Sequence, residues 1–455
     1  MKLENRTIRV PSPTRGTWLN ALSSAVSQEL GEQAYPLRLS IVSVTDQAAL
    51  AEVTVLVLTD GETETLGIDS AAIFAPRQKE FQARPFAVVN IVPTGVRCDI
   101  GGYAGDACPV TNLLASAADV LITHPNAVNA SELNEMLPSV LYAEGKTLDD
   151  FLLGQVGLLP VASNRIGTFV DPSGLDYLED LTAALDAARA AAGIDCGVYV
   201  VMRETMGVNI AWSETGCAVG TITNPDVVLE AVDALLADGV QAVGGVSVIR
   251  GVTQEMFTRH MRGEIPNPSG GVEAILTHLV STLYRVPTAH APLPYYQQLK
   301  RKVGRDPRAA AEFISTPHYM CVLKGLARAP RPVLLQSLAA APPQLLTVNN
   351  VGAIVAPASC LGGLPAMAAQ VSGIPLIAVR ENRTILDVTN ARMKMPNVIE
   401  VDSYLAAAGV VLALRQGISL ESLQRPLTTA RRLELPEPSE AGAIAPAETV
   451  LLRSS

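Results

Sequence analysis

The segment Phe86-Ala-Val-Val-Asn-Ile-Val92 runs directly into Pro93-Thr-Gly-Val-Arg-Cys-Asp-Ile-Gly-Gly-Tyr-Ala-Gly-Asp-Ala-Cys-Pro-Val110. The first part is an apolar run typical of a buried strand, and the second is a turn rich in glycine. The apolar residues that follow predict a helix over Val110–Ala118. Because a strand, a glycine turn and a helix in this order present free backbone N–H groups and the positive end of a helix, the segment favours a bound anion.

A second segment of the same kind lies towards the other end of the chain. Val351-Gly-Ala-Ile-Val-Ala356 precedes Pro357-Ala-Ser-Cys-Leu-Gly-Gly-Leu-Pro-Ala-Met367. Each turn carries a cysteine shortly before a Gly-Gly pair, Cys98 in the first and Cys360 in the second. We expect the two turns to meet at one cleft that holds a small molecule.

Composition limits the classes of protein to which the chain can belong. Its 455 residues, 48% hydrophobic and 17% charged, predict two or three folded domains. A net charge of -10 argues against nucleic acid or a membrane as the main partner. Six cysteines without a C-x-x-C pair and a charged, polar N-terminus predict a cytoplasmic protein. Abundant Ala, Val and Leu are consistent with a homo-oligomer.

Alternating strand and helix patterns predict an α/β fold with two Rossmann-like parallel-sheet halves. We expect a small N-terminal α/β domain over residues 1–84 and a first half over 85–259. A helical and loop insertion over 260–343, the second half over 344–426 and a tail over 427–455 complete the predicted organisation.

Four segments carry a family resemblance. They are the first glycine turn, Ile122-Thr-His-Pro-Asn-Ala-Val-Asn-Ala-Ser-Glu-Leu-Asn-Glu135, Asn267-Pro-Ser-Gly-Gly-Val-Glu-Ala274 and the Cys360 turn. Together they resemble a large uncharacterised family found mainly in cyanobacteria and other bacteria. The resemblance covers nearly the whole chain, implies a cytosolic protein of cyanobacterial type, and brings no known activity with it.

The Cys360 turn has a second, local likeness. With Gly373-Ile-Pro-Leu-Ile-Ala-Val379 it is similar to the cysteine-bearing strand, turn and helix of aspartate/glutamate racemases, which set one thiol on each side of a carbon acid. The likeness implies that Cys98 is the opposite thiol and that a helix N-terminus lowers the thiol pKa. The asparagine and threonine partners of that cysteine are replaced here by Leu361-Gly-Gly363, and a packing role for at least one of the two cysteines is the alternative.

Polar residues at the ends of predicted strands supply the other candidates. As catalytic residues we predict Cys98, Cys360, His124 and Asp99. As anion-binding residues we predict Gly101, Gly102, Gly105, Asp106, Asn126, Asn129, Asn267, Gly270, Gly271, Gly362, Gly363 and Arg380. Helix capping by Asp106 and simple turn formation by the asparagines and glycines are the structural alternatives.

These residues favour an enzyme that performs proton transfer on a small carboxylate or phosphorylated metabolite, of racemase, isomerase or lyase type. A nucleotide-sugar-dependent transferase and a non-catalytic metabolite-binding regulatory protein remain the alternatives. The spacing of the histidines and cysteines predicts no dedicated metal site. The standard ATP and NAD fingerprints are missing, and the sequence identifies no cofactor.

Overall fold

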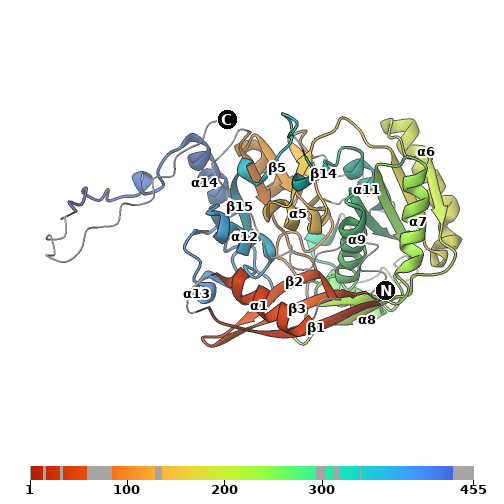
Figure 1. Cartoon of the computed structure of the whole chain (residues 1–455), viewed down its shortest axis with the longest axis horizontal. Coiled ribbons are helices and arrows are strands. Elements are labelled where there is room, and N and C mark those ends of the chain that lie inside the picture. The colour runs from red at the N-terminus through yellow and green to blue at the C-terminus, as the bar shows by residue number, and fades with distance from the viewer. Residues whose placement is uncertain are drawn as a thin grey trace.

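The computed structural model describes residues 2–13, 17–30, 34–58, 85–128, 136–293, 304–310, 318–338 and 340–433. Within them the chain forms an α/β fold with two parallel sheets, as the sequence predicted. Figure 1 shows these two regions side by side above a smaller N-terminal sheet, drawn in red.

The larger sheet has six parallel strands in the order β17-β16-β15-β4-β5-β6. Their bounds are β4 Ala87–Asn90, β5 Val120–Thr123, β6 Val140–Tyr142, β15 Val351–Pro357, β16 Leu376–Val379 and β17 Val398–Val401. All four residues of β4 and all seven of β15 are buried. They read as continuous apolar runs because helices cover both faces of the sheet.

Helices α3 (Cys108–Ala117) and α14 (Tyr404–Gln416) pack against each other on one face of this sheet. Helix α12 (Leu364–Ser372) packs on β15 and contacts α5 (Gly145–Leu152). The short helix α4 (Pro125–Val128) follows β5, and the short helix α13 (Asn390–Met393) precedes β17.

The second parallel sheet has four strands in the order β13-β12-β8-β9. Its strands are β8 Ile166–Val170, β9 Val198–Val201, β12 Ala242–Ser247 and β13 Thr288–Pro292. Its region of the fold also holds helices α6 Leu178–Ala192, α7 Asp226–Ala237, α8 Gln254–Met261, α9 Gly270–Tyr284 and α11 His318–Ala327. Two antiparallel pairs lie outside the two parallel sheets, namely β10 (Val208–Trp212) with β11 (Ala218–Ile222), and β7 (Val156–Leu159) with β14 (Arg331–Leu334).

The N-terminal unit, which we define as β1 (Lys2–Pro11), α1 (Trp18–Leu30), β2 (Ala34–Val44) and β3 (Ala48–Val57), is a three-stranded antiparallel sheet with one helix. Its helix shows a 3.6-residue pattern of buried positions that includes Trp18, Leu22 and Val26.

Two details differ from the expected organisation. Strands β4 and β15 were assigned to separate halves, but they hydrogen-bond to each other in one sheet. The predicted insertion over 260–343 is also more than helices and loops, because β13 is an edge strand of the four-stranded sheet. Which distant strands pair depends on tertiary contacts, and local sequence patterns do not encode them.

Candidate functional site

A cavity of about 300 Å³ lies where the carboxyl ends of the two parallel sheets approach the N-terminal unit. Thr94 follows β4, His124 follows β5 and Glu144 follows β6, while His290 lies within β13 of the other sheet. Ligands of open α/β sheets bind at this edge of the strands, so the position suits a binding site.

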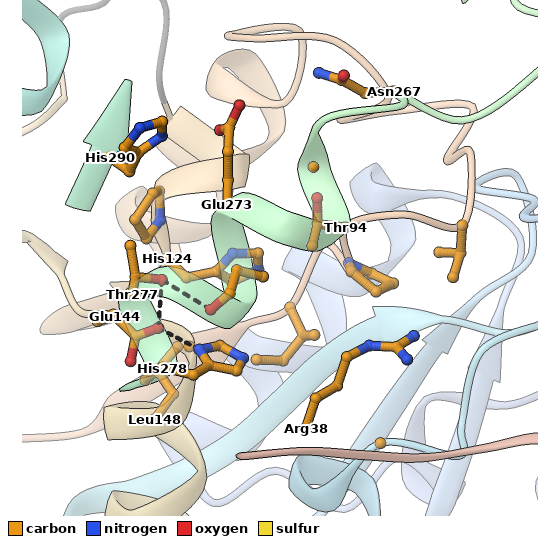
Figure 2. Close-up of a pocket in the computed structure, with 18 of the residues that line it drawn as sticks. Arg38, Thr94, His124, Glu144, Leu148, Asn267, Glu273, Thr277, His278 and His290 are labelled. Carbon is orange, nitrogen blue, oxygen red and sulfur yellow. Dashed lines mark hydrogen bonds and ion pairs between the residues drawn. The ribbon is translucent and has the colours of Figure 1, made fainter. Parts of the chain in front are cut away.

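Helix α9 connects the parts of the cavity wall. It packs against α5, β2, β11 and β13, and its residues Glu273, Thr277 and His278 line the cavity. Figure 2 shows Glu144, Thr277 and His278 grouped on one side of the pocket, and Arg38 of β2 on the other.

Glu144 and His278 form the closest polar pair on this wall. Oε1 of Glu144 is 2.5 Å from Nδ1 of His278 and 3.0 Å from the hydroxyl oxygen of Thr277. Oε2 of Glu144 accepts hydrogen bonds from the backbone N–H groups of Lys146 (2.7 Å) and Thr147 (3.2 Å), which makes Glu144 the N-cap of α5. Both carboxylate oxygens are therefore held in place.

The environment keeps Glu144 ionised. Burial alone would raise its pKa, but the charge and hydrogen bond of His278, with the backbone of Thr147, lower the pKa of Glu144 to about 2. A carboxylate at Nδ1 fixes the tautomer and orientation of an imidazole. Nε2 of His278 has no hydrogen-bond partner among the described residues, and His278 lines the cavity, so this nitrogen is available to a ligand.

Gly145 allows the imidazole to lie so close. A Cβ atom at this position would be 2.9 Å from Cε1 of His278. Next along α5, Asp149 also lines the cavity, and burial raises its pKa to about 7 although Lys146 opposes the shift. The Lys146 ammonium is itself buried and pairs with Asp150.

The other two cavity histidines are neutral. Burial lowers the pKa of His124 to about 4, and its Nε2 accepts a hydrogen bond from the backbone N–H of Val92 at 2.9 Å. Burial lowers the pKa of His290 to about 3, and its Nε2 lies 2.9 Å from the Ser247 hydroxyl. Nδ1 of His290 has no partner among the described residues, although the side chain is nine-tenths buried.

The cavity brings together part of the predicted site. Among the predicted residues, those that line it are Gly102, His124, Asn267, Gly270, Cys360 and Gly363. Both glycine turns therefore contribute to one cavity. Asn126 lies on α4 and Asn129 lies outside the described residues.

The thiols are not arranged as the racemase likeness implies. Cys98 is buried away from the cavity lining, and its S–H donates to the carbonyl of Pro93 at 3.4 Å. Burial raises the pKa of Cys98 well above its usual value and that of Cys360 to about 12. The expected lowering of the thiol pKa is wrong because desolvation disfavours the thiolate.

The predicted charged residues have structural partners. Asp99 pairs with Arg383 at 2.7 Å, and Asp106 accepts a hydrogen bond from the backbone N–H of Gly101 within the turn. Arg380 is exposed and pairs with Glu400 and Asp402. None of these three predicted side chains lines the cavity.

The remaining predicted glycines serve backbone packing. Gly101 and Gly105 have φ angles of 88° and 83°, which favour glycine. A Cβ at Gly271 would be 2.2 Å from the carbonyl oxygen of Ala218, and one at Gly362 would be 1.8 Å from that of Ile41. Gly101, Gly105 and Gly362 lie in the two glycine turns and Gly271 lies in the first turn of α9, and none of the four lines the cavity.

Sequence reasoning missed Glu144, His278 and Arg38. Glu144 had a usable signal, since it follows the apolar run Val140–Tyr142 at a strand end, where ligand-binding residues gather. His278 is in the middle of a helix and Arg38 within a strand, positions that carry no local sign of function.

Two features, a membrane-spanning helix and a cluster of metal ligands, are absent from the part of the chain that the structure describes. No described helix has both the length and the apolar character needed to cross a bilayer. Within the described ranges, no group of three or more His, Cys, Asp or Glu side chains is arranged to hold a metal ion.

Comparison with known proteins places the chain among uncharacterised relatives. No solved structure matches it significantly. An uncharacterized lipoprotein of Synechococcus sp. is 35% identical over 342 residues, which cover 75% of this chain and 94% of that protein. The model of a family described as "Protein of unknown function (DUF3326)" matches residues 87–424. The chain therefore belongs to this family.

Proposed function

We propose that the protein is an enzyme that binds a small anionic metabolite in this cavity and transfers a proton to or from it. The observation that supports this most directly is the 2.5 Å contact between Glu144 and His278 on the cavity wall. A histidine oriented by a carboxylate is a common general base, because the carboxylate stabilises the imidazolium that forms.

In the proposed reaction, Nε2 of His278 accepts a proton from a C–H or O–H bond of the ligand. Glu144 stays ionised and balances the new positive charge. Asp149, whose pKa is about 7, is a second group that can return a proton near neutral pH. This pairing supports chemistry of isomerase, racemase or lyase type without thiols as the acid and base.

Two polar features of the cavity support a polar, anionic ligand. Arg38 places a guanidinium on the wall opposite His278 (Figure 2). Nδ1 of His290 is a buried hydrogen-bonding atom without a partner among the described residues, and such atoms are costly unless a ligand or water satisfies them.

Hydrogen exchange tests the proposal. The full chain is incubated in D₂O with a panel of small hydroxy acids, amino acids and phosphorylated acids, and ¹H NMR follows the loss of the C–H signal next to each carboxylate. We expect exchange with at least one compound, and a loss of about 10²–10⁴-fold in its rate in His278→Gln. Glu230→Gln, which removes an exposed carboxylate on α7, is the control and should exchange as the parent does.

An exchange rate in His278→Gln equal to that of the parent would contradict the proposal. Ligand binding without exchange of any compound in the panel would instead indicate a non-catalytic metabolite-binding protein.

The cellular location and the oligomeric state stay predictions. The relative from Synechococcus is named a lipoprotein, a class attached to a membrane surface by a lipid, whereas the sequence predicts a cytoplasmic protein. Fractionation of cells that produce the full chain distinguishes a membrane-attached protein from a cytoplasmic one. Light scattering of the purified protein tests the expected homo-oligomer.

A further inference from the structure

The N-terminal unit contributes to the cavity although it precedes the region that the family model matches. Arg38, Leu39 and Ser40 of β2 line the cavity, and the matched region begins at residue 87. The Glu144–His278 pair, in contrast, lies entirely within the matched region. One wall of the site therefore comes from a separate part of the chain.

Several contacts fix this unit to the rest of the molecule. The backbone N–H of Ile41 donates to the carbonyl of Gly362 at 2.8 Å. The indole N–H of Trp18 donates to the carbonyl of Met393 at 2.6 Å, and the Thr215 hydroxyl donates to Oε1 of Glu52 at 2.6 Å. Figure 1 shows the unit extending beneath both parallel-sheet regions. These contacts set the position of β2 at the cavity.

One N–H group of the Arg38 guanidinium is already used in a hydrogen bond to Glu52. Nη1 donates to Oε2 of Glu52 at 3.2 Å, and both side chains are largely buried, with 14% and 7% exposed. Nε and Nη2 have no hydrogen-bond partner among the described residues. Two parallel N–H groups on one edge match the two oxygens of a carboxylate, so a fixed arginine of this kind suits bidentate binding.

The charges around the cavity limit the charge of the ligand. Among the described lining residues, Arg38 is the single lysine or arginine, and the acidic side chains are Glu144, Asp149 and Glu273. Glu144 is ionised at neutral pH because its pKa is about 2. Glu52 already pairs with Arg38, and Glu144 pairs with His278. A second negative charge on the ligand would therefore face Asp149 and Glu273 with no further lysine or arginine among the described lining residues, and such like-charge contacts disfavour binding.

We propose that the N-terminal unit selects the ligand, with Arg38 binding the single carboxylate of a monoanionic compound and the acidic wall disfavouring dianions such as phosphate. This inference rests on the proposed function in one respect, namely that the cavity is the ligand site. It narrows the ligand from a carboxylate or phosphate to a monocarboxylate, and it assigns Arg38 as a specificity-determining residue.

Binding to the full chain tests this without any measurement of turnover. Isothermal titration calorimetry is performed at pH 7.5 with glycolate, lactate and 3-hydroxybutyrate, and separately with inorganic phosphate. We expect at least one monocarboxylate to bind, and phosphate to bind at least about ten-fold more weakly, the factor of one lost charged contact. Arg38→Gln should weaken the binding of the monocarboxylate by about ten- to hundred-fold.

Two variants make the result specific. Arg9→Gln removes an exposed arginine of β1 and should bind as the parent does. Arg38→Lys keeps the charge but loses the bidentate edge, so its affinity should fall between those of the parent and Arg38→Gln.

The inference is overturned if none of the three monocarboxylates binds, if phosphate binds as tightly as they do, or if Arg38→Gln leaves their affinity unchanged. A failure of proton exchange with intact, Arg38-dependent binding would therefore count against the proposed catalysis alone.

Discussion

Oε1 of Glu144 and Nδ1 of His278 are 2.5 Å apart, although 134 positions separate the two residues in the chain. Glu144 stands at the N-terminus of α5 and His278 in the middle of α9, so the packing of these two helices brings them together. The contact gives the cavity a defined proton acceptor, and it also affects the stability of the fold.

In Glu144→Gln the free energy of unfolding should fall less steeply than in the parent as the pH is lowered. The folded pKa of Glu144, about 2, is lower than the usual 4.5, so its ionisation stabilises the fold above pH 4.5, and this contribution is lost as the pH falls towards 2. The shift corresponds to roughly 3 kcal/mol in the parent. Urea unfolding at pH 5, 4 and 3 measures the free energy of unfolding of both proteins. If this free energy falls equally steeply with pH in the parent and in the variant, Glu144 is not responsible for the pH dependence.

His124→Gln should also change the pH dependence, but at higher pH. The folded pKa of His124 is about 4, whereas the usual value is 6.5, so protonation of the unfolded chain destabilises the parent as the pH falls from 6.5 to 4. This effect lowers the free energy of unfolding of the parent by up to roughly 3 kcal/mol. The glutamine carbonyl can still accept the N–H of Val92, so folding is expected to persist. Unfolding free energies between pH 7 and 4.5 should fall less steeply in the variant than in the parent.

Gly145→Ala should lower turnover while both members of the Glu144–His278 pair remain present. The new Cβ would be 2.9 Å from Cε1 of His278, which is too close, so the imidazole must move. Because small displacements of a catalytic group are costly, we expect at least about a ten-fold loss in the rate of proton exchange. Unchanged exchange would mean that the ring position is not critical. Circular dichroism checks that the variant folds.

Gly362→Ala should destabilise the fold, and Gly409→Ala should not. A Cβ at Gly362 would be 1.8 Å from the carbonyl oxygen of Ile41, so β2 must move away, and we expect a loss of about 2 kcal/mol or more. Gly409 is exposed within α14 and has no atom within 4 Å of the corresponding position. Alanine there should stabilise by roughly 0.5–1 kcal/mol. Urea unfolding of both variants tests the contrast, which two equal changes would contradict.

Cys98→Ala should keep its catalytic rate. The thiol is buried, its pKa is raised, and the residue does not line the cavity, so the change removes only a small buried group. We expect a rate within about three-fold of the parent and a stability loss of roughly 1 kcal/mol. A rate lost while the variant remains folded would restore Cys98 as a catalytic candidate. Steady-state rates and thermal unfolding provide the two measurements.

The sequence by itself determined the local structure and the fold class. The apolar runs that became β4 and β15 and the glycine turns after them are visible as short, contiguous patterns. Burial on both faces requires such runs in a parallel strand, and a tight turn requires glycine where φ is positive, as at Gly101. Ligands of open α/β sheets bind at the carboxyl ends of the strands. This expectation pointed to His124 and Cys360, which do line the cavity.

Only the tertiary structure decided which residues share the cavity. Arg38, Glu144 and His278 come from β2, the N-cap of α5 and α9, three elements that are distant in the chain. The same structure separated Cys98 from the cavity by burying it in the turn. The physical reason is that periodicity and turn chemistry act over a few residues, whereas a site depends on how whole helices and sheets pack, and that packing is set by contacts between distant segments.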